Sequence, residues 1–317
     1  MNEPAVSIII PTYNRVRLLR EALDSVSRQT FRDFEVIVVD DGSTENVAAV
    51  AADHPTRPTV LRQQRKGPAA ARNRGIQAAR GAILAFLDSD DLWLPEKLER
   101  FIAALNAAPG VRIFYGPMAP ITEDGRPVPG RSKPCRGGRI TEHLFCSSFV
   151  HVPTVVCRKD VLLQAKCFDE SLPVCEDYDL WLRLSVKETF GLIEEPLALR
   201  RLHGDRLSKA CMSRNLAIKA TVLRRFYEAT RAQGCLNPKV AETRLARVCF
   251  VAARAALWNG DYQRAAELCR ASRHYGQNPV RTWPIALAAA VLGCLGGKSD
   301  TPADANMKCT SKGTGVA

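Results

Sequence analysis

The chain has 317 residues, of which 46% are hydrophobic and 25% charged, an ordinary balance for a soluble globular protein with a sizeable core. No apolar run reaches the roughly 20 residues that a transmembrane helix needs, so no membrane span is predicted. The formal net charge is +12, and residues 211–317 hold 16 Lys or Arg against 6 Asp or Glu, so the basic excess belongs to the C-terminal third.

The first 120 residues alternate between predicted strands and helices. The strands are near-continuous apolar runs, and the helices carry apolar residues at helical spacing, which predicts an α/β fold with a mostly parallel sheet flanked by helices. Ser43 or Thr44 is expected to cap a short helix that ends near residue 53, and Pro68 and Pro95 suit first helical turns. The other elements are strands at 6–13, 34–41, 59–64, 82–88 and 111–117, and helices at 17–29, 68–80 and 95–108.

Residues 121–150 show weaker periodicity, with a turn at "EDGRP" and a flexible basic loop at "GRSKPCRGGR". Beyond residue 210 the pattern is entirely helical, and "ALWNGDYQRAAELCRAS" predicts two helices joined by an Asn-Gly-Asp turn. The residues after 297 are expected to form a disordered tail. The predicted elements here are strands at 154–158 and 191–202, and helices at 159–165, 175–188, 214–232, 239–258, 261–274 and 281–295.

Polar side chains follow three predicted strands at the point where each strand ends. In a parallel sheet, ligands bind beyond the carboxyl ends of the strands, so these side chains predict a site at one edge of the sheet. They are Thr12, Tyr13 and Asn14 after the first strand, Asp40 and Asp41 after the second, and Asp88 and Asp90 after the fourth.

Three carboxylates occur within four positions in "LDSDD". Residues two apart on a strand point the same way, so Asp88 and Asp90 are expected to face one point, with Asp91 directed elsewhere to cap the following helix. Carboxylate oxygens are ligands for hard divalent cations, and such a metal can also hold a diphosphate. The alternative is that all three are solvent-exposed loop acids.

Asp40 and Asp41 lie in "VVDDGST" and could accept hydrogen bonds from a base or a ribose hydroxyl. The alternative is a simple strand–turn with Gly42 at positive φ. The chain has neither G-x-G-x-x-G nor G-x-x-x-x-G-K-[ST], so neither a dinucleotide fingerprint nor a P-loop is predicted.

Five segments follow one another in a diagnostic order: "VSIIIPTYNR", "FEVIVVDDGST", "GPAAARNRGIQAARGAILAFLDSDD", "CEDYDLWLRL" and "RLHGDRLS". In order and spacing they resemble family 2 inverting glycosyltransferases, which have the GT-A, Rossmann-like fold. The resemblance covers roughly residues 5–208. It implies a GT-A domain at 1–208, with a nucleotide-sugar-binding half at 1–120 and an acceptor-binding half at 121–208, followed by a helical region at 209–297.

The resemblance also implies roles for individual residues. Asp177 resembles the family's catalytic base, with Glu176 beside it. Asp90 resembles a direct metal ligand of the D-x-D motif, and Asp88 a ligand of the metal and of the sugar or ribose. The remaining residues expected to bind the nucleotide sugar are Pro11, Thr12, Tyr13, Asn14, Asp40, Asp41, Arg72, Asn73, Ser89, His203 and Ser208.

Some of these residues, and Trp181 near Asp177, have a structural alternative. Tyr13 could pack at a strand end, Arg72 could be a surface cation of its helix, and Asp177 could cap a helix start. Trp181 could face the acceptor or belong to the core, and His203 could be purely structural.

The implied reaction moves a sugar from a nucleoside diphosphate to a hydroxyl of a glycan or lipid-linked acceptor, as in bacterial surface polysaccharide synthesis. The resemblance favours UDP as the nucleotide, because UDP is common in the family. A carboxylate takes the acceptor proton while a divalent metal, Mn²⁺ or Mg²⁺, stabilises the departing diphosphate. Two other interpretations stay open: a nucleotidyltransferase on a similar sheet, and a non-catalytic binding subunit of a glycan-assembly complex.

The 11 cysteines form no C-x-x-C pair and no Cys/His cluster at zinc spacing. The N-terminus has no signal-peptide pattern, so reduced thiols and a cytoplasmic location are expected. The basic C-terminal third favours an anionic partner, and "RTWPIALAAAVLGCLG" suggests peripheral contact with the inner face of the cytoplasmic membrane. The alternatives are a solvated basic face and a packed helical cap; no nucleic acid partner is predicted.

Overall fold

The computed structural model describes residues 3–130, 134–202 and 212–295. The chain divides into two compact units, Met1–His203 with Val222–Ala241, and Gly204–Thr221 with Glu242–Ala317. The domain boundary predicted at residue 208 falls in 203–211, outside the described residues.

A seven-stranded sheet in the order β3-β2-β1-β4-β8-β6-β9 forms the centre of the first unit. All its strands run parallel except β8, which is antiparallel to both β4 and β6, so the predicted mostly parallel sheet is confirmed. The strands are β1 Val6–Thr12, β2 Phe34–Asp40, β3 Thr59–Arg62, β4 Ile83–Phe86, β6 Ile113–Tyr115, β8 Val156–Arg158 and β9 Phe190–Leu192.

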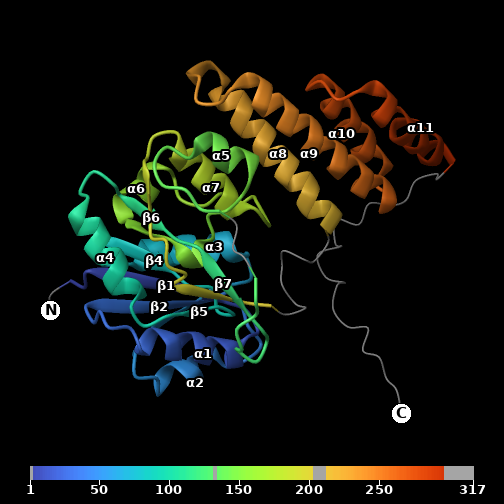
Figure 1. Ribbon diagram of the computed structural model, residues 1–317. Helices are drawn as coiled ribbons and strands as arrows, with labels where there is room; N and C mark the ends of the chain where they lie inside the picture. The colour runs from blue at the N-terminus through green and yellow to red at the C-terminus, as the bar shows by residue number, and fades with distance from the viewer. Residues whose placement is uncertain (1–2, 131–133, 203–211, 296–317) are drawn as a thin grey trace, which may run out of the picture. The chain divides into compact units, whose positions relative to one another are not determined.

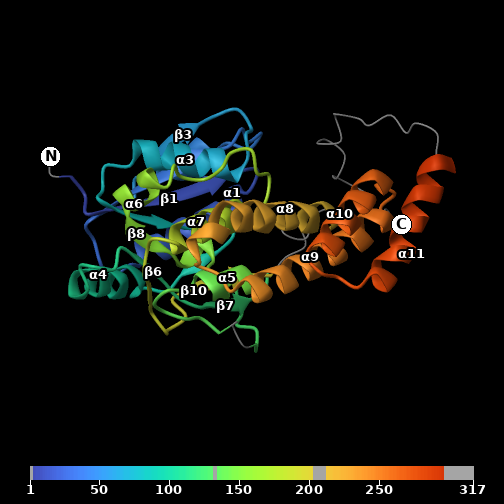
Figure 2. The ribbon, with the colours of Figure 1, turned by 90° about the horizontal axis from the view of Figure 1, so that it is seen from above.

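Helices cover both faces of this sheet because its central strands are apolar on both sides. In Figure 1, α1 and α2 lie on one face, and α3, α6 and α7 lie on the other; Figure 2 looks down on the second face. Ile8 and Val38 pack with Leu23 of α1 and Phe101 of α4 in the core. The helices are α1 Val16–Ser27, α2 Val47–Ala52, α3 Pro68–Ala78, α4 Lys97–Ala107, α6 Lys159–Gln164 and α7 Glu176–Ser185.

A second, three-stranded sheet has the order β5-β10-β7, and all three of its strands follow β4 in the sequence. It consists of β5 Leu92–Trp93, β7 Met118–Ile121 and β10 Ala198–Arg201. The loop region predicted at 121–150 also contains a helix, α5 Thr141–Cys146, which the sequence pattern did not indicate.

The structure corrects three local predictions. The single strand expected at 191–202 is two strands in different sheets, β9 and β10, because Pro196 between them lacks an N–H and restricts the residue before it. Asn46, rather than Ser43 or Thr44, caps α2 by accepting a hydrogen bond from the Ala49 N–H at 3.1 Å. Pro95 precedes α4 by two residues, whereas Pro68 does open α3.

The described residues of the second unit form helices joined by short turns. They come from α8 Met212–Thr230, α9 Pro238–Trp258, α10 Tyr262–His274 and α11 Pro279–Leu295, and parts of α8 and α9 belong to the first unit. The predicted Asn-Gly-Asp turn between α9 and α10 is confirmed: Gly260 has φ +77°, and Asp261 caps α10 through the Arg264 N–H at 3.1 Å. Among the described residues, no helix combines the length and the apolar character that a membrane span requires.

Candidate active site

The carboxyl end of β1 is tied to the loop after β2. Asn14 adopts a positive φ of 49°, and its backbone N–H donates to Ser43 Oγ at 3.0 Å. Asn14 Oδ1 accepts from the Thr44 N–H at 2.8 Å. Thr12 Oγ1 is buried beside this connection and has no hydrogen-bond partner among the described residues, which marks it as an atom available to a ligand.

Asp40 and Asp41 at the end of β2 are both buried and serve neighbouring loops. Asp40 Oδ1 accepts from the Ser43 N–H at 2.8 Å, which holds the turn after the strand. Asp41 Oδ1 accepts from Gln63 Nε2 and the Lys66 N–H, each at 2.8 Å. Its Oδ2 accepts from the Gly67 N–H, also at 2.8 Å, so both Asp41 oxygens fix the loop between β3 and α3.

Tyr13 lies beside that same loop. The guanidinium carbon of Arg65 is 4.1 Å from the centre of the Tyr13 ring, a cation–π contact. An aromatic ring and a cation therefore lie next to each other at the rim formed by β1 and the β3–α3 loop.

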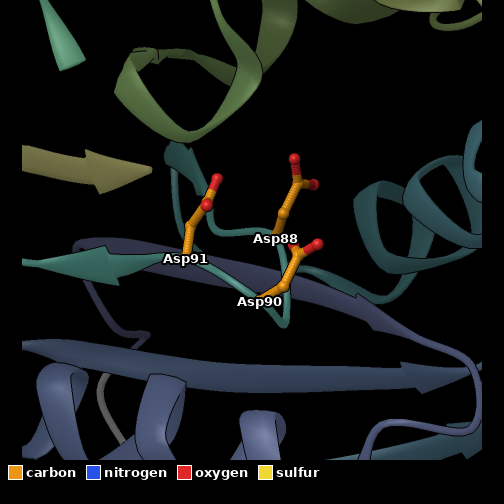
Figure 3. A group of neighbouring side chains, drawn as sticks. All are labelled: Asp88, Asp90 and Asp91. Carbon is orange, nitrogen blue, oxygen red and sulfur yellow. The ribbon is translucent and has the colours of Figure 1, made fainter. Parts of the chain in front are cut away.

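Asp88, Asp90 and Asp91 rise from one turn after β4 (Figure 3). One carboxylate oxygen from each lies within 4.8 Å of the others, so the prediction that Asp91 points elsewhere is wrong. Asp91 lies six residues before α4 and does not cap it; its Oδ1 accepts from the Arg201 N–H at 3.1 Å. Three hard oxygen donors this close fit Mg²⁺ or Mn²⁺ in their chemistry.

Two arginines hold this turn. Arg15, directly after Asn14, forms an ion pair through Nη1 with Asp90 Oδ2. Arg201 of β10 is 1% exposed, and its Nε donates to the Asp90 carbonyl at 3.1 Å. Because Nη2 of Arg201 also pairs with Glu21 of α1 at 2.6 Å, the turn is anchored to both the small sheet and α1.

Arg72 of α3 connects the turn to the start of α7. Its Nη2 donates to Asp88 Oδ1, and its Nη1 to Glu176 Oε1, both at 2.7 Å. Arg72 is 5% exposed, so the alternative of a surface cation is wrong. Burial lowers the pKa of Arg72, but the charges of Asp88 and Glu176 outweigh this and raise it above its ordinary value, so the guanidinium stays charged. Its Nε has no partner among the described residues.

Asp177 follows Glu176 in the first turn of α7. Burial, together with the negative charges of Glu176 and Asp88, raises the pKa of Asp177 to about 7, against the opposing effects of Arg72 and of a hydrogen bond. That bond is local: Asp177 Oδ1 accepts from the Tyr178 N–H at 2.7 Å. A carboxyl group with this pKa exchanges its proton near neutral pH.

The other predicted residues are distributed around this centre. Asn73 lies beside Arg72 and braces the segment before α7, donating to the Phe168 carbonyl at 2.9 Å and to Glu170 Oε1 at 2.8 Å. Pro11 lies within β1, and Ser89 is buried between the two D-x-D acids. Trp181 is fully buried against Phe168, so the alternative that it belongs to the core is confirmed. His203 and Ser208 lie outside the described residues.

A hollow of about 390 Å³ opens elsewhere on the first unit, around α5. Its lining contains none of the predicted site residues and is formed by Pro134, Arg136, Glu142, His143, Cys146, Ser147 and Phe149. The acidic centre is therefore defined by its contacts and charges and not by this hollow.

Comparison with known proteins identifies the family. The family model described as "Glycosyl transferase family 2" matches residues 7–154. An uncharacterized glycosyltransferase of Haemophilus influenzae is 31% identical over 234 residues, which cover 72% of this chain and 79% of that protein. The chain belongs to glycosyl transferase family 2. It spans about a third of the length of another similar protein of this kind, the uncharacterized glycosyltransferase RC0461 of Rickettsia conorii, which is 32% identical over 209 residues, or 64% of this chain and 34% of that protein.

Solved structures share the fold of this family 2 chain. S. aureus TarS 1-349 in complex with UDP superposes with a TM-score of 0.64 at 18% identity, covering 90% of this chain and 87% of that one. A mannosyltransferase from Pyrobaculum calidifontis in complex with GDP-Man and Mn²⁺ has a TM-score of 0.56 at 19% identity, covering 94% and 89%. The expected GT-A type fold is confirmed by this likeness.

Sequence reasoning missed three residues at the centre. Asp91 was excluded by the two-residue periodicity of a strand, but β4 ends at Phe86 and residues 88–91 form a turn, where this periodicity does not hold. Arg15 could have been noticed as a cation directly after the polar end of β1. Arg201 lies 110 residues from Asp91, and no local pattern connects the two.

Proposed function

We propose that this family 2 glycosyltransferase is a metal-dependent, inverting enzyme of hexosyltransferase type. It moves a sugar from a nucleoside diphosphate sugar, with UDP sugars the first to test, to a hydroxyl of a glycan or lipid-linked acceptor. The proposed setting is bacterial surface polysaccharide synthesis, with the enzyme in the cytoplasm at the inner face of the membrane.

The bridge made by Arg72 carries this proposal. By donating to both Asp88 and Glu176 at 2.7 Å, Arg72 keeps the D-x-D turn close to the acidic start of α7, although the two acids are 88 residues apart in the chain. A sugar transferase needs cationic charge at the leaving diphosphate and a base at the acceptor hydroxyl. Because the D-x-D turn and the start of α7 lie close together, one site can provide both the positive charge and the base.

Asp90 and Asp88 are the residues proposed to hold the divalent metal, with Asp91 within reach. When bound there, Mg²⁺ or Mn²⁺ supplies Lewis-acid stabilisation of the negative charge that gathers on the diphosphate. The donor set supports this assignment because it consists of carboxylate oxygens within 4.8 Å of one another. The similar fold of the mannosyltransferase in complex with GDP-Man and Mn²⁺ is a further support.

Asp177 is the proposed general base. Its carboxylate accepts the proton of the acceptor hydroxyl as that oxygen forms a bond to the anomeric carbon and the bond to the diphosphate breaks. A single displacement of this kind inverts the anomeric configuration. A pKa of about 7 suits the task, because the group is then partly ionised at neutral pH and still basic enough to take a proton.

Glu176 supports this base through its charge. Its carboxylate accepts a hydrogen bond from Arg72, and its negative charge contributes, after burial, to raising the pKa of Asp177. Arg72 remains protonated, so it can place positive charge near the diphosphate through Nε, which has no partner among the described residues.

The nucleotide is proposed to lie along the ends of β1 and β2. Thr12 Oγ1 is a buried hydroxyl open to a hydrogen bond, and the next residue, Tyr13, brings an aromatic ring with the Arg65 guanidinium over one face. The Asp41 oxygens already fix the β3–α3 loop, so Asp41 supports a base contact through its remaining lone pairs and through the loop it positions.

A donor screen tests the proposal. We expect one nucleotide sugar, in the presence of Mn²⁺, to raise the melting temperature of the full chain and to be slowly hydrolysed to the nucleoside diphosphate without an acceptor. Excess chelator should abolish the hydrolysis. Release of pyrophosphate instead would indicate a nucleotidyltransferase. Absence of any thermal shift and any hydrolysis across the panel would indicate a non-catalytic subunit.

A further inference from the structure

Helix α11, Pro279–Leu295, is apolar nearly all round, with Arg281 as its single charged residue. Only part of its surface is used inside the second unit: Thr282, Ile285 and Ala289 are buried, and α10 packs against α11. Several of its large apolar side chains are left exposed, by 77% at Val280, 63% at Trp283, 53% at Leu287, 48% at Val291 and 41% at Leu292.

Four of these five exposed side chains form one continuous stripe, and Leu292 lies on the other side of the helix. At 3.6 residues per turn, Val280, Trp283, Leu287 and Val291 fall within about 100° of the helix circumference, on the side away from Ile285 and Ala289. A helix that ends a stack of helices normally presents a polar outer face to water. The α11 stripe, defined as these four residues, presents an apolar one.

The segment of the printed sequence that follows α11 holds few side chains that could cover this stripe. Residues 296–317 are mostly small and polar, and Met307 and Val316 are their only large apolar residues. A second copy of the chain is disfavoured by charge, because residues 212–221 and 242–295 hold nine Lys or Arg and three Asp or Glu. Two such basic surfaces repel one another across a symmetric interface.

The charge favours an anionic surface instead. Arg281 is exposed in the first turn of α11, about 120° around the helix from the middle of the stripe, and Arg264 and Arg270 are exposed on α10, the helix packed against α11. Trp at the end of an apolar helical face, with Arg nearby, is the composition of helices that lie in the headgroup region of a bilayer. Anionic lipids attract such juxtaposed basic groups.

We propose that the α11 stripe lies on an anionic phospholipid bilayer, with Trp283 and Leu287 inserted among the acyl chains and Arg281 at the headgroups. This binding surface belongs to the second unit, and none of its residues is assigned to the acidic centre, which belongs to the first unit. Its success or failure is therefore independent of the proposed sugar transfer.

The test is co-sedimentation of the full chain with phospholipid vesicles. We expect binding to phosphatidylcholine vesicles that contain phosphatidylglycerol, little binding to phosphatidylcholine alone, and loss of binding at high salt. The double variant Trp283→Ser, Leu287→Ser should lower the vesicle affinity by about tenfold or more, because both inserted side chains are removed. Brominated acyl chains should quench the fluorescence of the wild type more than that of Trp283→Phe.

Leu163→Ser is the matched control, because Leu163 of α6 is 50% exposed, close to the 53% of Leu287, but lies in the first unit. It should bind vesicles like the wild type. Donor hydrolysis by the double variant should be unchanged, which shows that the first unit folds, and its helical circular dichroism signal should match that of the wild type, which shows that the second unit folds. Equal vesicle binding by the double variant and the wild type would overturn the proposal. So would a dimer in light scattering that the double variant dissociates while vesicles bind neither form.

Discussion

The two acid pairs of the site, Asp40–Asp41 after β2 and Glu176–Asp177 at the start of α7, have similar side chains in different surroundings. Both Asp41 oxygens accept from N–H groups of the β3–α3 loop, at 2.8 Å each. The pKa of Asp177 is instead raised by burial first and then by the charges of Glu176 and Asp88, and its carboxylate accepts a hydrogen bond from the neighbouring Tyr178 N–H. A carboxylate supplied with donors holds structure together, whereas one shielded from water among other acids has a raised pKa and can exchange a proton.

The largest expected effect separates the two pairs by activity. Asp177→Asn should lower the turnover number by about 10²- to 10⁴-fold while the dissociation constant of the donor stays unchanged, because the amide cannot take the acceptor proton. Steady-state kinetics and donor titration measure the two quantities. Asp53→Asn, an exposed acid at the end of α2, is the control and should be neutral. Near-normal turnover of Asp177→Asn would remove Asp177 from the mechanism.

The second-largest effect distinguishes the two acid pairs by their contribution to the free energy of unfolding. Asp41→Ala should lower the free energy of unfolding by about 1–3 kcal/mol, because it leaves the Lys66 and Gly67 N–H groups without their acceptor. Denaturant titration measures this change.

Asp177→Asn should raise the free energy of unfolding in the same denaturant titration, whereas Asp41→Ala lowers it. Since the folded-state pKa of Asp177, about 7, lies above its ordinary value near 3.9, ionising it costs stability as the pH rises from about 4 to 7. Above pH 7 the Asn variant should therefore unfold at a higher denaturant concentration than the wild type, and below pH 4 the two should agree. Destabilisation above pH 7 would place Asp177 with Asp41 as a structural acid.

The pH profile tests the cause of the raised pKa. We expect kcat/KM to fall about tenfold per unit below an apparent pKa near 7, since the carboxylate is the active form. Glu176→Gln should shift this fall in kcat/KM to lower pH, because the substitution removes a negative charge that raises the pKa of Asp177. If the pH at which kcat/KM falls were unchanged, either burial alone would set the pKa of Asp177 or another group would titrate.

The smallest effect concerns the ion pair at the D-x-D turn. Arg15→Met should strengthen Mn²⁺ binding by a few-fold, because the Arg15 guanidinium pairs with the Asp90 carboxylate that the metal is proposed to bind. Titration of the donor-free chain, followed by electron paramagnetic resonance of free Mn²⁺, measures the affinity. Arg17→Met is the matched control, since Arg17 lies two residues further along the chain and pairs with Glu21. Weaker Mn²⁺ binding by Arg15→Met would mean that Arg15 organises the site and does not compete for it.

The sequence by itself determined the parallel strands, the helices between them and the delivery of Thr12, Asp41 and Asp88 to one edge of the sheet. These features follow from local periodicity and from the rule that parallel strands end on the same side. The split of residues 191–202 into strands of two sheets was missed because both halves have the same apolar pattern.

Only the tertiary structure decided how the acids work together. Arg72 lies 104 residues from Glu176, and its burial between Glu176 and Asp88 depends on how folding places α3, α7 and the D-x-D turn. The raised pKa of Asp177 depends in the same way on burial and on charges brought from distant parts of the chain. Local sequence encodes which groups are present, but the electrostatic energy between them depends on distance and solvent exclusion, which folding alone fixes.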